Sequence, residues 1–165
     1  QSRKFMKSER LRVEKALESG LSLVRSVLDS LLDDLADKGQ TMALDLSEQS
    51  EAQRRLALSR LREKTGVQYA ALFTTNGQLL ATATSDLGVS MSAPPSLDKL
   101  RQARSGRGYR EIESDGGNEL LLRVLVPVAP VGLGMETRIL QLTQPVPTNL
   151  ALNADRVQQV YRDYQ

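Results

Sequence analysis

The residues with the clearest capacity for chemistry form a run of cations beside one phenol. They are Arg101, Arg104, Arg107, Tyr109 and Arg110. A guanidinium group can bind a carboxylate through two parallel charge-assisted hydrogen bonds, and a phenol adds a further donor. Two arginines on later segments could face the same space: Arg123 and Arg138. The pattern therefore predicts a site for a small anionic ligand, such as a carboxylate.

Four residues make up the predicted ligand-binding set: Arg101, Arg107, Tyr109 and Arg123. Acidic residues on the same segments leave a second interpretation open. In that interpretation the arginines lie on the surface and balance three carboxylates, those of Glu111, Glu113 and Glu119. The choice depends on which of these side chains the fold brings together.

Two missing residue types limit the remaining chemistry. The chain has no histidine and no cysteine, which excludes Ser-His-Asp and Cys-His catalysis, thiolate zinc sites and disulfides. Asp33, Asp34 and Asp37 resemble a cation site, but on a helix they fit better as the solvated side of an apolar seam. Two glycine pairs later in the chain lack the strand–turn–helix setting of a phosphate-binding loop. We therefore predict no catalytic residue, no metal and no cofactor in this segment.

Length and charge narrow the class of protein. A chain of 165 residues suits one domain, or one domain with a helical arm. The 22 Lys and Arg residues nearly cancel the 20 Asp and Glu residues, and aromatic residues make up only 4%, so nothing favours nucleic-acid binding. No apolar run approaches the roughly 20 residues that a membrane-spanning helix needs. Because the sequence begins without Met and stops inside a helical pattern, we expect it to be part of a longer protein.

A long helix is predicted for residues 2–38, which contain no Pro and one Gly besides strong helix formers. An apolar seam with a 3.5-residue repeat runs along it: Leu17, Leu21, Val24, Leu28, Leu31 and Leu35. A second row of mostly small residues lies about 100° away: Ala16, Gly20, Leu23, Val27 and Ser30. One row can cover a sheet while the other meets a second copy. The predicted helix and dimer seam comprises Leu17, Gly20, Leu21, Val24, Val27 and Leu28, and Lys38-Gly39 is predicted to end the helix.

The remainder of the chain predicts a sheet followed by one more helix. Ser50 and Gln53 form a capping-box pattern that opens a helix to about residue 64, and Gly66 ends it. Strands are predicted at 67–74, 78–84, 109–114, 119–128 and 137–145, with a short helix at 97–104. Asn76-Gly77 is a hairpin turn, and the last helix starts at about residue 148. Short turns between strands imply an antiparallel sheet, with helices on one face, in an α+β fold.

Two stretches carry a resemblance to a known family. They are residues 9–18 (ERLRVEKALE) and residues 140–147 (LQLTQPVP) running into residues 157–165 (VQQVYRDYQ). The chain resembles the extracytoplasmic sensor domain of NtrY-type nitrogen-regulation sensor histidine kinases, with a PAS-like PDC, or single Cache, fold. The resemblance implies one sensor domain over residues 1–165. Its parts would be a helical arm (1–65), a sheet (66–147) and a C-terminal helix (148–165) that leads to a membrane span.

The resemblance also implies a function and a set of partners. The segment would be a non-catalytic, periplasmic sensor in the inner membrane, signalling through its terminal helices to a histidine kinase core outside this sequence. It would form a homodimer, be held by flanking membrane spans, and act on a response regulator through the absent domains. A second function class is left open, a cytoplasmic protein-interaction or dimerisation module with a PAS-like sheet.

Overall fold

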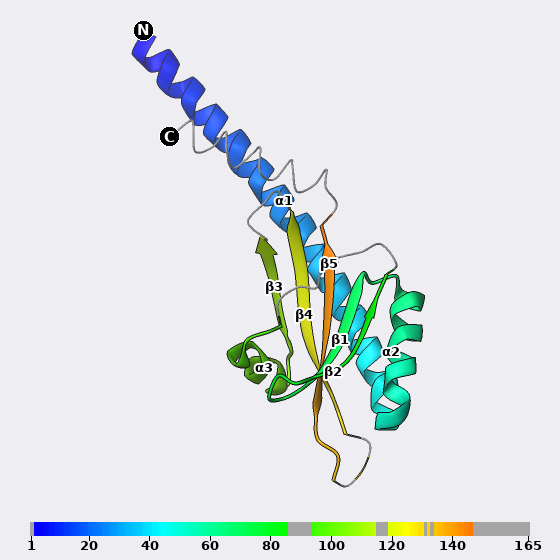
Figure 1. The fold of residues 1–165 in the computed structure, drawn as a ribbon. Helices are drawn as coiled ribbons and strands as arrows, with labels where there is room; N and C mark the ends of the chain where they lie inside the picture. The colour runs from blue at the N-terminus through cyan, green and yellow to red at the C-terminus, as the bar shows by residue number, and fades with distance from the viewer. Residues whose placement is uncertain (1, 86–93, 115–118, 131, 133, 147–165) are drawn as a thin grey trace.

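The computed structural model describes residues 2–85, 94–114, 119–130, 132 and 134–146. The helices are α1 (Ser2–Ser47), α2 (Glu51–Thr65) and α3 (Leu97–Arg104) (Figure 1). The strands are β1 (Tyr69–Thr74), β2 (Leu79–Thr84), β3 (Tyr109–Ser114), β4 (Leu120–Val128) and β5 (Arg138–Pro145). The predicted α+β class, the long N-terminal helix and the five-stranded antiparallel sheet are therefore confirmed.

The five strands form a single antiparallel sheet in the order β2-β1-β5-β4-β3. β5 comes last in the chain but lies in the centre, where it joins the β1–β2 hairpin to the β3–β4 pair. β1, β4 and β5 are almost continuously buried, whereas the edge strands β2 and β3 alternate between inward and outward residues. Alternation of this kind is typical of strands with one covered face.

Helices cover both faces of the sheet. α1 packs on β4 and β5, and α2 packs on β1 and β2, so the main apolar core lies between these helices and one face. On the opposite face, Leu100 and Ala103 of α3 pack with Leu125 and Ile139. Strand residues alternate between faces, so Leu125 lies opposite its core neighbours Val124 and Val126. α1 and α2 form the predicted helical layer on one face, but the prediction missed α3, whose own apolar side covers the other face.

The first helix is longer than predicted. Gly39 does not end it, and α1 continues to Ser47. A Cβ atom at position 39 would lie 2.9 Å from Cγ2 of Val126 and 3.6 Å from Cδ1 of Leu142. The glycine therefore lets the helix lie close against β4 and β5. Glycine is needed at position 39 because strands from elsewhere in the chain pack against it. The local sequence alone does not distinguish this role from that of a helix stop.

The shorter turns follow the sequence more closely. Gly66 ends α2 in the left-handed conformation and donates its N–H to the Arg62 carbonyl, and Gly77 has a φ of 91° in the β1–β2 turn. Ser50 is the N-cap of α2, but its side chain makes no capping hydrogen bond, so the predicted capping box does not form. The predicted C-terminal helix at 148–165 lies outside the described residues.

Candidate functional site

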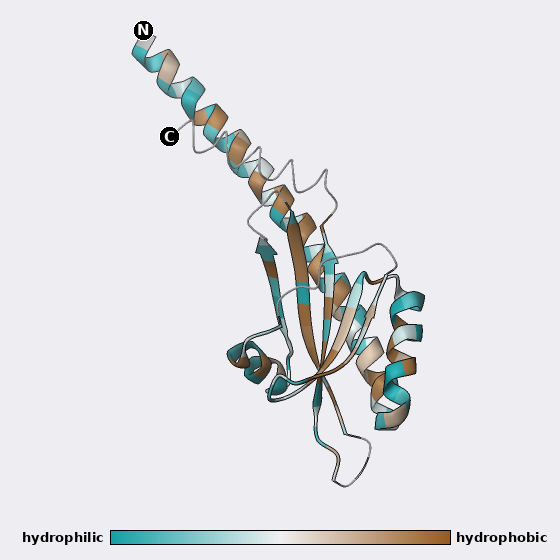
Figure 2. Ribbon diagram, viewed as in Figure 1, coloured by the Kyte–Doolittle hydropathy of each residue, from teal (hydrophilic) through white to brown (hydrophobic). Residues whose placement is uncertain are grey.

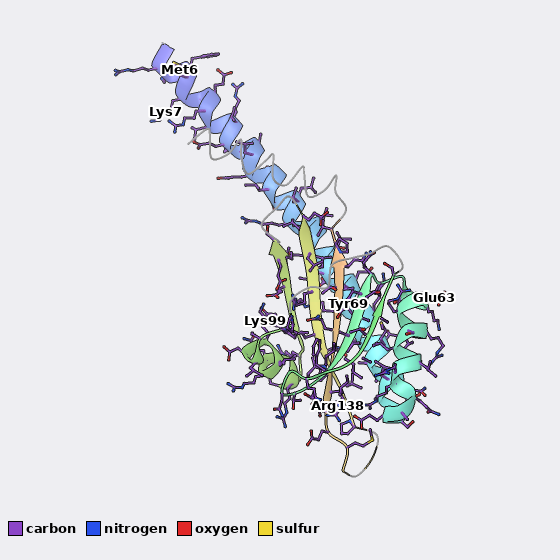
Figure 3. All side chains as sticks on the ribbon, viewed as in Figure 1. Met6, Lys7, Glu63, Tyr69, Lys99 and Arg138 are labelled. Atoms are coloured by element: carbon purple, nitrogen blue, oxygen red, sulfur yellow. The ribbon has the colours of Figure 1, made fainter. Side chains whose placement is uncertain are left out.

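The main polar feature of the molecule lies on the face of the sheet that α3 borders. We call it the charged cluster, and it comprises Lys99, Tyr109, Glu111, Glu113, Arg123 and Gln141. Lys99 comes from α3 (Figure 3). Three residues come from alternate positions of β3, which places them on one face, while Arg123 and Gln141 come from β4 and β5.

Arg123 is the buried centre of the charged cluster, with a side chain that is only 3% exposed. Its Nη1 donates to Oε1 of Gln141 at 2.9 Å, and its Nη2 donates to Oε2 of Glu113 at 2.9 Å. Its Nε lies 3.3 Å from Oε1 of Glu111, the residue directly opposite on β3. A buried guanidinium group is tolerated only when such partners repay the loss of hydration.

Glu111 joins the two cations and the phenol. Lys99 Nζ lies 2.7 Å from Oε1 of Glu111 and 3.3 Å from Oε1 of Glu113. Tyr109 Oη donates to Oε2 of Glu111 at 2.8 Å, and Lys99 Nζ lies 5.9 Å from the centre of the Tyr109 ring. Two cations therefore face two carboxylates, and the formal charge of the cluster is zero.

The electrostatics of the charged cluster shift the pKa values of Glu111, Lys99 and Tyr109. Burial alone raises the pKa of the Glu111 carboxyl, but the neighbouring side chains of Glu113, Lys99 and Tyr109 outweigh burial and lower it to about 2. The hydrogen bond to Glu111 raises the pKa of Lys99, and likewise that of Tyr109. Each pKa shift favours the protonation state in which these side chains contact one another. The charged cluster is therefore a network in which the cations and carboxylates pair with each other.

The predicted ligand-binding residues do not all meet. Tyr109 and Arg123 both contact Glu111, as described above. The Arg101 side chain is 77% exposed and lies 3.8 Å from Asp98, and Arg107 is also exposed. The reason is the orientation of α3, which turns Leu100 and Ala103 toward the sheet and Arg101 toward solvent.

The second sequence interpretation named the right carboxylates for Arg123. Glu111 and Glu113 do balance it, but the guanidinium group is buried rather than on the surface. Sequence reasoning missed Lys99 and Gln141 altogether. The alternation of Tyr109, Glu111 and Glu113 was a usable signal, because residues two apart on a strand share a face.

The other candidate residues lie elsewhere. Arg110 is on the opposite face of β3 and contacts Asp33 of α1. Arg138 pairs with Glu51 and Glu136 at the start of β5. Asp34 forms an ion pair with Lys38 one helical turn away. Within the described part of the chain, no three acidic side chains are grouped so that they could hold a metal ion.

A second buried arginine, Arg54 of α2, holds together three segments. Its Nε donates to the carbonyl of Leu46 at 3.0 Å, in the last turn of α1, and its Nη2 donates to the carbonyl of Ala129 at 3.4 Å, just after β4. A cation favours the C-terminal end of a helix, where backbone carbonyls lack helical partners. Burial lowers the pKa of this guanidinium group, and Glu51 acts in the opposite direction.

Comparison with known proteins finds matches among solved structures alone. No family model matches the chain, and no curated protein matches it. Solved structures do match, among them one described as MglB with tetrameric arrangement and one of the gliding protein MglB from Thermus thermophilus. Each is 18% identical with a TM-score of 0.34 and covers 70% of this chain, and the match spans 90% and 91% of the MglB chains respectively. Similarity at this level does not assign a function.

The comparisons contradict the predicted sensor function and location. Two of the solved structures that match are of MglB, and neither is described as a sensor kinase. We therefore withdraw the nitrogen-sensing function, the inner-membrane and periplasmic location, and the membrane and response-regulator partners; the kinase core expected in a longer parent chain has no support. No helix in the described ranges combines the length and hydropathy required to cross a bilayer.

Proposed function

We propose that this chain is a protein-interaction module with a PAS-like sheet, and that it forms a parallel homodimer through the part of α1 that extends beyond the sheet. One observation carries the proposal. α1 has 46 residues, but its first buried residue is Leu28. Residues 3–23 come before Val24, the first side chain of α1 that packs against the main core, and form a projecting arm that Figure 1 shows leaving the body of the molecule.

The arm carries apolar side chains that the rest of the described chain leaves uncovered. Leu11 is 52% exposed and Leu23 is 67% exposed, and Phe5 and Met6 are also exposed. Figure 2 shows apolar residues recurring along the arm between polar ones. Most of the stability of helices in proteins comes from packing of an apolar face, so pairing with a second helix would stabilise the arm.

The two rows of α1 predicted from the sequence differ in burial, and a dimer interface needs one row that the core leaves exposed. In the body of the molecule, Leu28 and Leu35 of the first row are buried in the main core. In the second row, Leu23 and Val27 are exposed. The first row therefore covers the sheet, while the second faces away from it. Leu28 is buried and Val24 packs against the core, so the proposed interface uses Gly20, Leu23 and Val27 together with Leu17 and Leu21, the first-row residues that lie beyond the core.

The body of the molecule provides a rigid support for the arm. α1 continues from the arm into the core without a break, and the charged cluster and Arg54 tie the strands and helices of the body together. Dimer formation would therefore place two sheets in a fixed relation. The PAS-like identity of the sheet rests on the sequence resemblance, supported by the five antiparallel strands and the long helix on one face.

Small-anion binding by Arg101, Arg107, Tyr109 and Arg123 stays a prediction from the sequence. In the structure Glu111 already contacts both Tyr109 and Arg123. An added carboxylate would have to displace Glu111 or bind the exposed Arg101 and Arg107 instead. For this reason, anion binding is not put forward as the main function.

Disulfide trapping tests the proposed dimer. The sequence has no cysteine, so a single introduced cysteine can react only with its copy in a second chain. In a parallel, in-register pair, Leu23→Cys and Val27→Cys should both form cross-linked dimers rapidly. An antiparallel pair would trap at most a cysteine near its two-fold axis. Sedimentation should show a dimer that Leu23→Asp weakens.

Arg25→Cys is the matched control, because it lies about 200° around the helix from Leu23 and is also exposed. It should form only slow collision products. A chain that sediments as a monomer at every concentration, with equal trapping at positions 23, 25 and 27, would show that the arm is not a dimer interface.

A further inference from the structure

β2 forms an edge of the sheet with an unusual composition. It pairs with β1, and no other described strand pairs with its outer side. Its six residues, LLATAT, include no charge and no proline, and Leu79 is 45% exposed. The opposite edge, β3, carries Arg110, Glu111 and Glu113. Charged residues and proline protect natural edge strands from pairing, so β2 lacks a protection that β3 has.

The hydrogen-bond pattern shows which backbone groups of β2 point outward. Ser85 donates its backbone N–H to the Gln68 carbonyl, so this pair bonds inward, toward β1. In an antiparallel pair, neighbouring residues alternate between inward and outward bonding. Thr82 and Thr84 therefore turn their N–H and C=O groups away from β1. Their side chains are exposed, while Ala81 and Ala83 are buried under α2.

A groove accompanies this edge. One hollow of about 440 Å³ is lined by Arg55 of α2 and by residues 79–82 of β2. A second, of about 310 Å³, lies between α2 and the sheet, with Leu72, Leu80 and Ala81 on its apolar side and Glu51, Arg54 and Arg55 on its polar side. Both hollows share Arg55, Leu80 and Ala81, so the edge strand and the helix form a continuous surface.

Arg55 adds a cation to this surface, and Glu51, the carboxylate that lines the second hollow, pairs with Arg138 instead. Arg55 is exposed, and no ion pair joins it to a carboxylate of the described residues, whereas Arg60 of the same helix lies 3.5 Å from Asp45. The β2 strand of a second copy has no acidic residue, so a strand that itself carries a carboxylate would give Arg55 a partner that β2 cannot provide. The charge therefore favours an acidic partner over self-pairing.

We propose that the β2 edge and Arg55 bind an extended acidic segment of a partner protein, which adds a sixth strand to the sheet. Backbone hydrogen bonds to Thr82 and Thr84 provide the pairing, and Leu79 and Leu80 contact the apolar side chains of the segment. A carboxylate of the segment pairs with Arg55. This surface is separate from the arm of α1, and its occupancy does not depend on the proposed dimer.

The test uses the whole chain and a labelled synthetic peptide of alternating threonine and valine with one central glutamate. Fluorescence anisotropy should show saturable binding. Arg55→Glu should weaken it about tenfold, as expected for loss of a charge-assisted hydrogen bond, and so should replacing the peptide glutamate by lysine. Thr82→Pro should abolish binding, because it removes an outward N–H from an edge position where proline is tolerated.

Three controls isolate the mechanism. Thr82→Ala keeps the backbone N–H and should bind normally, and Lys64→Glu makes the same charge change on an exposed residue at the far end of α2. Leu23→Asp, which weakens the proposed dimer, should leave peptide binding unchanged. Circular dichroism and thermal melting verify that Thr82→Pro is folded.

Three results would overturn the proposal. The first is an absence of saturable binding to the unmodified chain. The second is binding that Arg55→Glu and Thr82→Pro both leave unchanged. The third is a change of oligomeric state in Thr82→Pro without peptide binding in the parent chain, which would assign the edge to a second copy.

Discussion

A Cβ atom on Gly39 would lie 2.9 Å from Cγ2 of Val126, closer than folded proteins allow. Val126 is a buried, β-branched residue in the middle of β4, so its methyl group has little room to move. Gly39 therefore sets how closely α1 approaches the sheet, and this relationship yields the first prediction.

Gly39→Ala should destabilise the protein by about 1–3 kcal/mol, because overpacking of a dense core outweighs the better helix propensity of alanine, which is worth about 1 kcal/mol. Urea denaturation followed by circular dichroism measures the change. Gln40→Ala, at the exposed neighbouring position, should shift stability by less than about 0.5 kcal/mol.

A double variant checks the cause. Val126→Ala removes the methyl group that the new Cβ would meet, so Gly39→Ala should cost less in its presence than alone. Additive effects of the two substitutions would mean that the 2.9 Å contact does not govern the helix position.

The charged cluster should make stability depend on acid pH. Because the folded-state pKa of Glu111 is lowered to about 2 from its ordinary 4.5, its contribution is fully present above pH 4.5 and is lost as the pH falls toward 2. The loss should amount to at most about 3 kcal/mol for this group. Urea midpoints measured across this range would reveal it.

The matched variants for the pH experiment are Glu111→Gln and Glu51→Gln. Glu111→Gln should lower stability at neutral pH and flatten its dependence between pH 4.5 and 2. Glu51→Gln makes the same chemical change in an ion pair with Arg138, outside the charged cluster, and is the control for loss of a carboxylate. Parallel pH curves for the parent chain and Glu111→Gln would rule out the assignment.

Arg54 should contribute to stability through its two backbone contacts. Arg54→Met keeps most of the side-chain volume but leaves the carbonyl of Ala129 and one acceptor position of Leu46 without their donor. We expect a loss of about 1–3 kcal/mol in the free energy of unfolding. Arg55 is exposed, so Arg55→Met should change the free energy of unfolding little. Equal stability of the two variants would show that the buried guanidinium group gives no net stabilisation.

Local patterns in the sequence determined most of the elements of this protein. The predicted helix at 97–104 and strand at 109–114 coincide with α3 and β3, because Ser96 caps the helix and the strand alternates between faces. These signals act over a few residues, so no tertiary information is needed. The arm of α1 was likewise visible as an apolar repeat, and its exposure is consistent with the predicted second row.

Tertiary structure decided the rest. From the local sequence, Gly39 is predicted to end the helix. In the structure it lies inside α1 and allows the helix to approach β4 closely. Arg123 and Tyr109 were chosen for an anionic ligand, but the β3–β4 register places Glu111 opposite Arg123 and within reach of both. Partners of a buried charge come from strands far apart in the sequence. Their identity is set by strand order and register, which residue types and spacing within one segment do not encode.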